Sequence, residues 1–312
     1  MNPENMAGFR FLSRTFEHLF VNKPITATFL DIPMNKKRAL FGSMAVALIA
    51  MPLSIRADQL LVIDTANDRI LVCDTDSHQV DVFADIDAFD VAQSTDGNLY
   101  ASRTRSQKIS KLDKAGKVLS DWTVPGNRSA YGLVYDNGAV WANVGDSPSA
   151  LACFSEKDGQ IQKTASWGNV STSMRGLVRS ESLFYGVSFG NSMVKSLSDS
   201  LTQDPVWVEA KSARAVDVLI SNSGERFVSY QGDGKDSPDK SNAPGVYSDI
   251  SQSPVVTGFI PFGLAENNNR LYVSDIAGSI RIFDTSNGFA ERDKIELPPG
   301  TRPGMLCILK AK

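Results

Sequence analysis

The stretch FDVAQSTDGNLYAS, from Phe89 to Ser102, holds two runs of strand-forming residues separated by the turn Asp96-Gly97. The same pattern returns in YGLVYDNGAVWAN from Tyr131 and in FGLAENNNRLYVSD from Phe262. One residue pair marks the same point of each copy: Asp90-Val91, Gly132-Leu133, Gly176-Leu177, Asp217-Val218, Gly263-Leu264 and Gly304-Met305. Successive pairs are 42, 44, 41, 46 and 41 residues apart. Such a regular spacing indicates a chain built from repeated structural units.

Each unit has room for four short strands. Apolar and polar residues alternate with period two, and turn residues such as Asn137-Gly138 and Ser223-Gly224 favour hairpins over helices. Four strands in about 40 residues are typical of one blade of a β-propeller. We therefore predict an all-β fold, a six-bladed β-propeller with four antiparallel strands in each blade.

The two ends of the repeat array are incomplete in complementary ways. The last copy, from Arg302 to Leu309, runs straight into the C-terminus, whereas QLLVIDTANDRILVCDTDSHQV from Gln59 resembles the second and third strands of a blade. Ring closure protects sheet edges that an open array would expose. We therefore predict one blade shared between the two ends, with its innermost strand from the C-terminus.

Two segments also resemble a known repeat family. FDVAQSTDGNLYASRTRSQKISKLDKAGKVL from Phe89 and FGLAENNNRLYVSDIAGSIRIFDTSNG from Phe262 are similar to NHL-type repeats. The resemblance covers Asp58 to Leu309 and implies the six-bladed propeller shared by NHL-repeat proteins and the gluconolactonase-like (senescence-marker) superfamily. It is specific for fold and not for activity.

The N-terminal part has a different character. Residues 34–57, MNKKRALFGSMAVALIAMPLSIRA, combine three basic residues, an apolar stretch and a small-residue end, which is the pattern of a secretory signal peptide. Residues 1–33 carry no periodic pattern and are interpreted as an extension before the true start at Met34. We expect residues 58–312 to form the single propeller domain of a periplasmic or secreted protein, with no membrane span after cleavage.

Charge and cysteine content narrow the partners. Residues 1–57 hold seven of the 32 basic and three of the 35 acidic residues, which leaves 25 basic and 32 acidic residues and a net charge of −7. An acidic domain without a basic cluster is a poor nucleic-acid binder.

Cys73, Cys153 and Cys307 lie in apolar strand runs and are expected to be buried thiols. Cys73 and Cys307 would lie two strands apart, about 9.6 Å, which is too far for a disulfide.

Candidate ligand residues lie where the inner strands begin. In propellers of this kind, the loops entering the inner strands share one face of the disc with the loops joining second and third strands. The candidates on this ligand face are Phe89, Asp90, Tyr131, Arg175, Asp217 and Phe262. An apolar wall with a few convergent polar groups suits a small-molecule pocket. The alternative is that the aromatic side chains only plug the channel.

Asp90 and Asp217 interrupt the glycines of the marked pairs and lie in opposite blades of a six-bladed ring. Two carboxylates facing one channel could hold Ca²⁺ or another divalent cation. The alternative is that each carboxylate accepts a hydrogen bond from a neighbouring loop amide at a strand start. The gluconolactonase-like resemblance implies a Glu, Asn and Asp metal triad with a Pro-Asp-Gly, but the matching stretches here are AVDV and PFGL. That triad cannot be carried over.

A histidine and an insertion are two further candidate sites. His78, the sole histidine after residue 57, lies in the turn DTDSHQV between the third and fourth strands, on the face opposite the ligand face. Propeller enzymes that need histidine ligands or a histidine base are thereby disfavoured. The insertion from Gln231 to Gly245 should overhang the ligand face, and its three aspartates, Asp233, Asp236 and Asp239, lack the alternate-residue spacing of an EF-hand loop. A flexible loop is the plainer interpretation.

Two functions remain open. The residues favour an exported monomer without catalytic activity, which binds a small molecule or a protein through the central-channel face. The alternative is a metal-dependent hydrolase or lactonase that uses Asp90 and Asp217.

Overall fold

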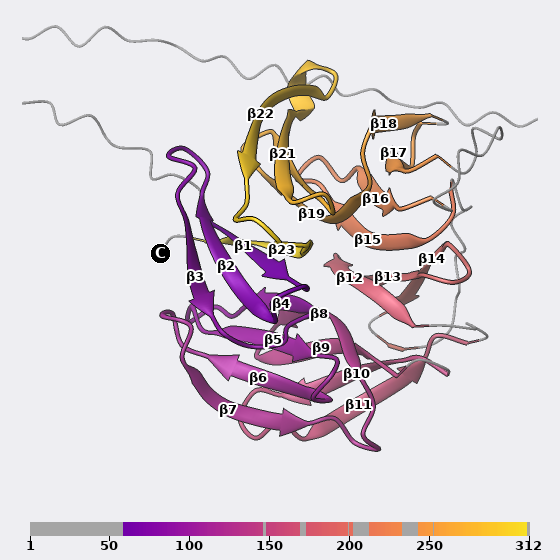
Figure 1. Cartoon of the computed structure of the whole chain (residues 1–312). Helices are drawn as coiled ribbons and strands as arrows, with labels where there is room; N and C mark the ends of the chain where they lie inside the picture. The colour runs from indigo at the N-terminus through magenta and orange to yellow at the C-terminus, as the bar shows by residue number, and fades with distance from the viewer. Residues whose placement is uncertain are drawn as a thin grey trace, which may run out of the picture. The chain divides into compact units, whose positions relative to one another are not determined.

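The computed structural model describes residues 59–145, 148–168, 173–198, 200–201, 212–232, 243–251 and 253–310. These residues form six small antiparallel sheets set around a common centre (Figure 1), and they include one short 3-10 helix, η2 (Thr285–Asn287). Five sheets have four strands and one has three within the described residues. The predicted six-bladed β-propeller is confirmed. No helix in this part of the chain has the length and apolar character needed to cross a membrane.

The blades are numbered from the one shared between the chain ends, the seam blade, and their strands are given from the axis outward. The seam blade contains β23 (Pro303–Leu309), β1 (Gln59–Asp64), β2 (Arg69–Asp74) and β3 (Val80–Ala84). The second blade contains β4 (Asp90–Gln93), β5 (Leu99–Arg103), β6 (Lys108–Leu112) and β7 (Val118–Thr123). The third blade contains β8 (Ala130–Asp136), β9 (Ala139–Val144), β10 (Ala150–Ser155) and β11 (Ile161–Ser166).

The other three blades follow the same order. The fourth blade contains β12 (Met174–Ser180), β13 (Leu183–Ser188) and β14 (Met193–Ser198). The fifth blade contains β15 (Ala215–Ile220), β16 (Arg226–Tyr230), β17 (Gly245–Ser248) and β18 (Pro254–Thr257). The sixth blade contains β19 (Pro261–Asn267), β20 (Arg270–Asp275), β21 (Ser279–Asp284) and β22 (Ala290–Glu296).

The seam closes as predicted. Strand β1 pairs with β2 on one side and with β23 on the other, so that Leu61 lies opposite both Val72 and Cys307. Cys73 on β2 and Cys307 on β23 are therefore separated by β1, and both are free thiols, as is Cys153. The blade is thus completed by strands from opposite ends of the repeat array.

The turns follow the sequence signals. Asn137 and Gly138 both have positive φ, 48° and 77°, which is the type I′ geometry of a tight hairpin. The insertion joins β16 to β17, as expected, but Asp233, Asp236 and Asp239 lie outside the described residues.

The core lies between blades. Along β20, Leu271 and Val273 pack into a cluster with side chains of the fifth blade, whereas Tyr272 between them packs into a cluster with the seam blade. Alternate residues of a strand point to opposite faces of its sheet. Because each blade packs against a neighbouring blade on both faces, both faces must be apolar. The outermost strand β22 is mostly exposed and charged, which protects the free edge from pairing.

Candidate functional site

Three glycines of the marked pairs, Gly132, Gly176 and Gly263, face the inner strand of the next blade. A Cβ atom on Gly132 would lie 2.2 Å from the Arg175 carbonyl oxygen, and one on Gly263 would lie 2.6 Å from that of Gly304. On Gly176 it would lie 2.6 Å from Asp217 Oδ1. Glycine is therefore required there by close backbone approach.

The two aspartates make a different contact at the same position. Asp90 Oδ1 accepts a hydrogen bond from the Val91 amide, and Oδ2 accepts one from the Leu133 amide of the next blade, each at 2.8 Å. Asp217 repeats this arrangement with the amides of Val218 and Leu264, again at 2.8 Å. Each carboxyl group thus bridges two blades, which is the hydrogen-bonding alternative that the sequence left open.

Burial changes the acidity of both groups. Asp90 and Asp217 are 9% and 8% exposed. Burial raises the pKa of Asp217 to about 7, against the lowering effect of its two amide partners. Burial, and next the charge of Asp217, raise the pKa of Asp90 to about 8.

The cation hypothesis stays a prediction. Among the described residues, no group of three or more His, Cys, Asp or Glu side chains could hold a metal ion. Asp90 and Asp217 would have to share a cation while both oxygens of each carboxyl group also accept an amide hydrogen bond.

Three predicted aromatic residues meet at the channel entrance. The Phe89 ring lies edge-on to Tyr131, with centroids 5.2 Å apart, and to Phe262, with centroids 6.2 Å apart. These rings come from the second, third and sixth blades. Phe262 is buried, but Phe89 and Tyr131 are only half-buried. The entrance is thus an aromatic surface that partly reaches solvent.

Arg175 joins this surface through a residue that the sequence analysis missed. Its guanidinium carbon lies 3.5 Å from the centroid of the Phe189 ring, a cation–π stack. Phe189 packs against the same core cluster as Phe89, a cluster that includes Phe262. Phe189 follows β13, in the loop that joins the second and third strands of its blade. An aromatic residue in a loop on this face is the feature by which the sequence could have identified it.

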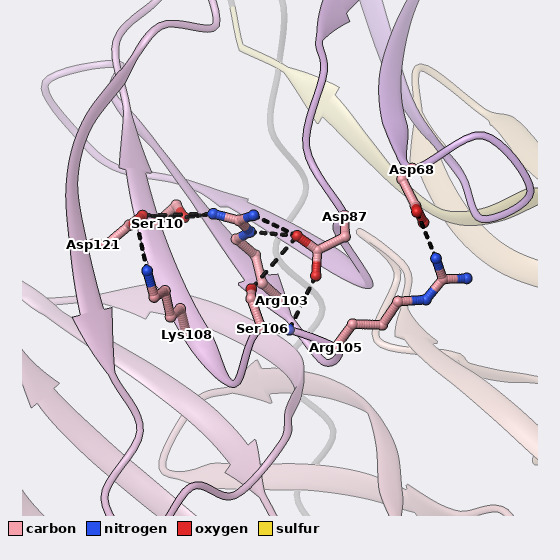
Figure 2. A network of polar contacts seen from close by, with 8 residues as sticks. All are labelled: Asp68, Asp87, Arg103, Arg105, Ser106, Lys108, Ser110 and Asp121. Carbon is pink, nitrogen blue, oxygen red and sulfur yellow. Dashed lines mark hydrogen bonds and ion pairs between the residues drawn. The ribbon is translucent and has the colours of Figure 1, made fainter.

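An ionic network holds the loop that leads to Phe89 (Figure 2). Arg103 lies between Asp87 and Asp121, with its Nε donating to Asp87 Oδ1 at 2.6 Å and its Nη1 3.7 Å from Asp121 Oδ1. The Ser106 amide donates to Asp87 Oδ2 at 3.2 Å. Beside it, Arg105 Nη1 lies 2.5 Å from Asp68 Oδ2 and links the second blade to the seam blade. Asp87 is two residues before Phe89, so this network fixes one side of the entrance.

Buried polar residues on the second strands support the inner strands, and sequence reasoning missed them too. Ser102 and Ser229 hydroxyl oxygens accept the amides of Asp90 and Asp217, each at 3.1 Å. Asn143 Nδ2 donates to the Gly176 carbonyl at 3.1 Å, and its Oδ1 accepts from Trp167 at 2.9 Å. These contacts satisfy buried peptide groups of the inner strands.

His78 lies where the sequence placed it. It sits in the turn between β2 and β3, and its Nε2 is 2.9 Å from Asp293 Oδ2 of the sixth blade. In an antiparallel blade, this turn is at the end opposite the turn between β1 and β2. His78 is therefore remote from the aromatic entrance.

Comparison with known proteins supports the fold. No protein-family model and no curated protein sequence matches the chain. A protein of unknown function from Bacteroides caccae is similar over 82% of this chain and 100% of its own, with TM-score 0.64 and 13% identity. A chain of the nidogen/laminin complex is similar over 81% and 98%, with TM-score 0.64 and 14% identity. Virginiamycin B lyase from Staphylococcus aureus is similar over 80% and 77%, with TM-score 0.51 and 15% identity. At these identities the shared feature is the propeller fold.

Proposed function

We propose that the chain is an exported binding module that holds a small molecule or a protein segment at the channel entrance. The observation that carries this proposal is the convergence of four inner-strand starts. Phe89, Tyr131 and Phe262 form one ring cluster, and Arg175 stacks on Phe189 against the same core. A half-exposed aromatic surface with one cation suits recognition better than packing alone, because packing requires no charge there.

The compared structures allow both binding and catalysis on this fold. One is a nidogen/laminin complex, in which proteins bind one another. Another is a catalytically inactive virginiamycin B lyase with quinupristin, in which a histidine is replaced by alanine. In the described part of this chain, the sole histidine is His78, on the face away from the entrance. This distribution favours binding over lyase chemistry.

Paired arginine variants test the proposal. A library of metabolites and peptides is screened by thermal shift, and each hit is measured by calorimetry on Arg175→Ala and on Arg179→Ala. Arg179 lies on the same strand, β12, at the other end, where it pairs with Asp136. We expect Arg175→Ala to weaken binding at least tenfold with little change in melting temperature, and Arg179→Ala to leave binding unchanged. Ligands that bind Arg175→Ala as tightly as the unsubstituted protein would refute the proposed site.

The hydrolase alternative has its own test. Metal analysis of purified protein would show stoichiometric calcium or zinc, lost in Asp217→Asn, if the two aspartates hold a catalytic cation.

Export is tested by N-terminal sequencing, which should give a start near Asp58 for secreted material.

A further inference from the structure

A concave site lies between the sixth blade and the seam blade. It is a pocket of about 220 Å³, and its lining residues are Thr75, Asp76, Arg270, Ile282, Arg292 and Asp293. Thr75 and Asp76 belong to the turn between β2 and β3, and Arg270 begins β20 after the turn from β19. Both turns lie at the blade ends opposite the aromatic entrance, so this pocket is separate from the proposed channel site.

The charged lining is balanced and loosely paired. Arg270 Nη1 lies 3.4 Å from Asp76 Oδ1, Arg292 pairs with Asp284, and Asp293 contacts His78 at 2.9 Å. The Arg270, Asp76, Arg292 and Asp293 side chains are 37%, 54%, 54% and 46% exposed. Except for Arg292–Asp284, in which the Asp284 side chain is only 4% exposed, these are exposed ion pairs that contribute little to stability, so a ligand can share or replace them.

Thr75 supplies the independent sign of a ligand. It is 3% exposed, and its Oγ1 is buried without a hydrogen-bond partner among the described residues. Buried hydroxyl groups are ordinarily satisfied by protein or by an occupant of the neighbouring space. Thr75 lines the pocket, so a rotation of its side chain would let an acceptor bound there complete its hydrogen bonding.

The charges define the class of occupant. A simple anion would meet Asp76 and Asp293, and a simple cation would meet Arg270 and Arg292. The pocket is also smaller than the roughly 300–1,000 Å³ of sites for drug-sized ligands. We propose that it binds a compact zwitterion of the free α-amino acid type. Its carboxylate lies against the two arginines and the Thr75 hydroxyl, its ammonium against the two aspartates, and its short side chain on Ile282.

Matched ligands test the zwitterion requirement. Glycine, alanine, serine, threonine and valine are titrated by calorimetry, with N-acetylalanine and alaninamide as controls that each lack one charge. We expect at least one free amino acid to bind saturably. Where alanine binds, N-acetylalanine and alaninamide should bind at least tenfold more weakly. Absence of binding by all five amino acids, or equal binding of N-acetylalanine and alanine, would overturn the proposal.

Matched variants test the location. Thr75→Val keeps the side-chain shape and removes the hydroxyl, so affinity should fall about tenfold while the melting temperature does not fall. Thr301→Val removes another buried hydroxyl that has no partner among the described residues and does not line the pocket, and it should leave affinity unchanged. Asp76→Asn, at an exposed turn, should also weaken binding. Unchanged affinity in both Thr75→Val and Asp76→Asn, or lost affinity in Arg175→Ala at the channel entrance, would refute this site.

Discussion

Two kinds of contact join neighbouring inner strands around the channel. Between β8 and β12, and between β19 and β23, a glycine leaves no room for even a Cβ atom before the next backbone. Between β4 and β8, and between β15 and β19, a whole aspartate side chain fits at the same position and bridges to an amide. The aspartate contacts must therefore leave space that the glycine contacts lack. The same position of the repeat thus holds either a glycine, which close packing requires, or an aspartate, which bridges two blades by hydrogen bonds.

The two aspartate contacts also differ from each other. In the fifth blade, the Ser229 hydroxyl donates to the Phe262 carbonyl of the sixth blade at 2.5 Å. In the second blade, the Ser102 hydroxyl lies 3.4 Å from the Asp90 carbonyl of its own blade. In the β15–β19 contact, both the aspartate and the serine bond to the next blade. In the β4–β8 contact, only the aspartate does so, because the serine stays within its own blade. The same residue pattern gives unequal cross-blade bonding.

The largest effect is expected from breaking a glycine contact. Gly132→Ala would place Cβ 2.2 Å from the Arg175 carbonyl and 2.7 Å from the Leu177 amide nitrogen, and neither backbone atom can move aside cheaply. Overpacking usually costs about 1–3 kcal/mol and occasionally more, and we expect at least about 3 kcal/mol here. Chemical denaturation measures the loss.

Gly138→Ala serves as its control. A Cβ there meets nothing within 4 Å, and only its φ of 77° opposes alanine. The cost should be about 1–2 kcal/mol, because only the left-handed conformation is penalised. Equal losses in the two variants would contradict the steric explanation of the glycine contacts.

Removing an aspartate bridge should have the next largest effect. Asp217→Ala leaves the amides of Val218 and Leu264 without their carboxylate acceptor, and each unpaired buried donor costs about 1–3 kcal/mol. We expect a total loss of about 2–4 kcal/mol, and a similar loss for Asp90→Ala. Denaturation midpoints compare the two. A variant as stable as the wild type would show that water replaces the bridge.

The bridges should also make stability depend on pH. Both carboxyl groups have a folded-state pKa above the unfolded value, so folding favours their protonated forms. Stability from this source is full below about pH 4 and is lost as pH rises through about 7 for Asp217 and about 8 for Asp90. We expect the melting temperature to fall by several degrees between pH 5 and pH 9. The Asp90→Asn/Asp217→Asn double variant should lack most of this slope, and an equal slope there would assign it to other groups.

The sequence predicted the repeat geometry far better than the site. The spacing of Asp90, Gly132 and their counterparts sufficed for six blades and the seam, because every blade must bury both faces with the same alternation. It also placed Phe89, Tyr131 and Phe262 at one entrance. It missed Phe189 and Ser229, because a loop aromatic or a strand serine has no distinguishing pattern in one sequence. Their roles depend on distances between blades that are far apart in the chain.

The smallest effect separates the two aspartate contacts. Ser229→Ala removes the acceptor of the Asp217 amide and the donor to the Phe262 carbonyl, so it cuts one bond within the fifth blade and one to the sixth. Ser102→Ala removes the acceptor of the Asp90 amide and only a long contact within the same blade. One buried hydrogen bond contributes about 0.5–1.5 kcal/mol, so Ser229→Ala should be the more destabilising of the two by about 1 kcal/mol. Both serines are fully buried, and both substitutions delete the same atom, so the difference in unfolding free energy reports the cross-blade bond alone. If Ser102→Ala proved equally costly, the two aspartate contacts would be energetically equivalent despite their geometry.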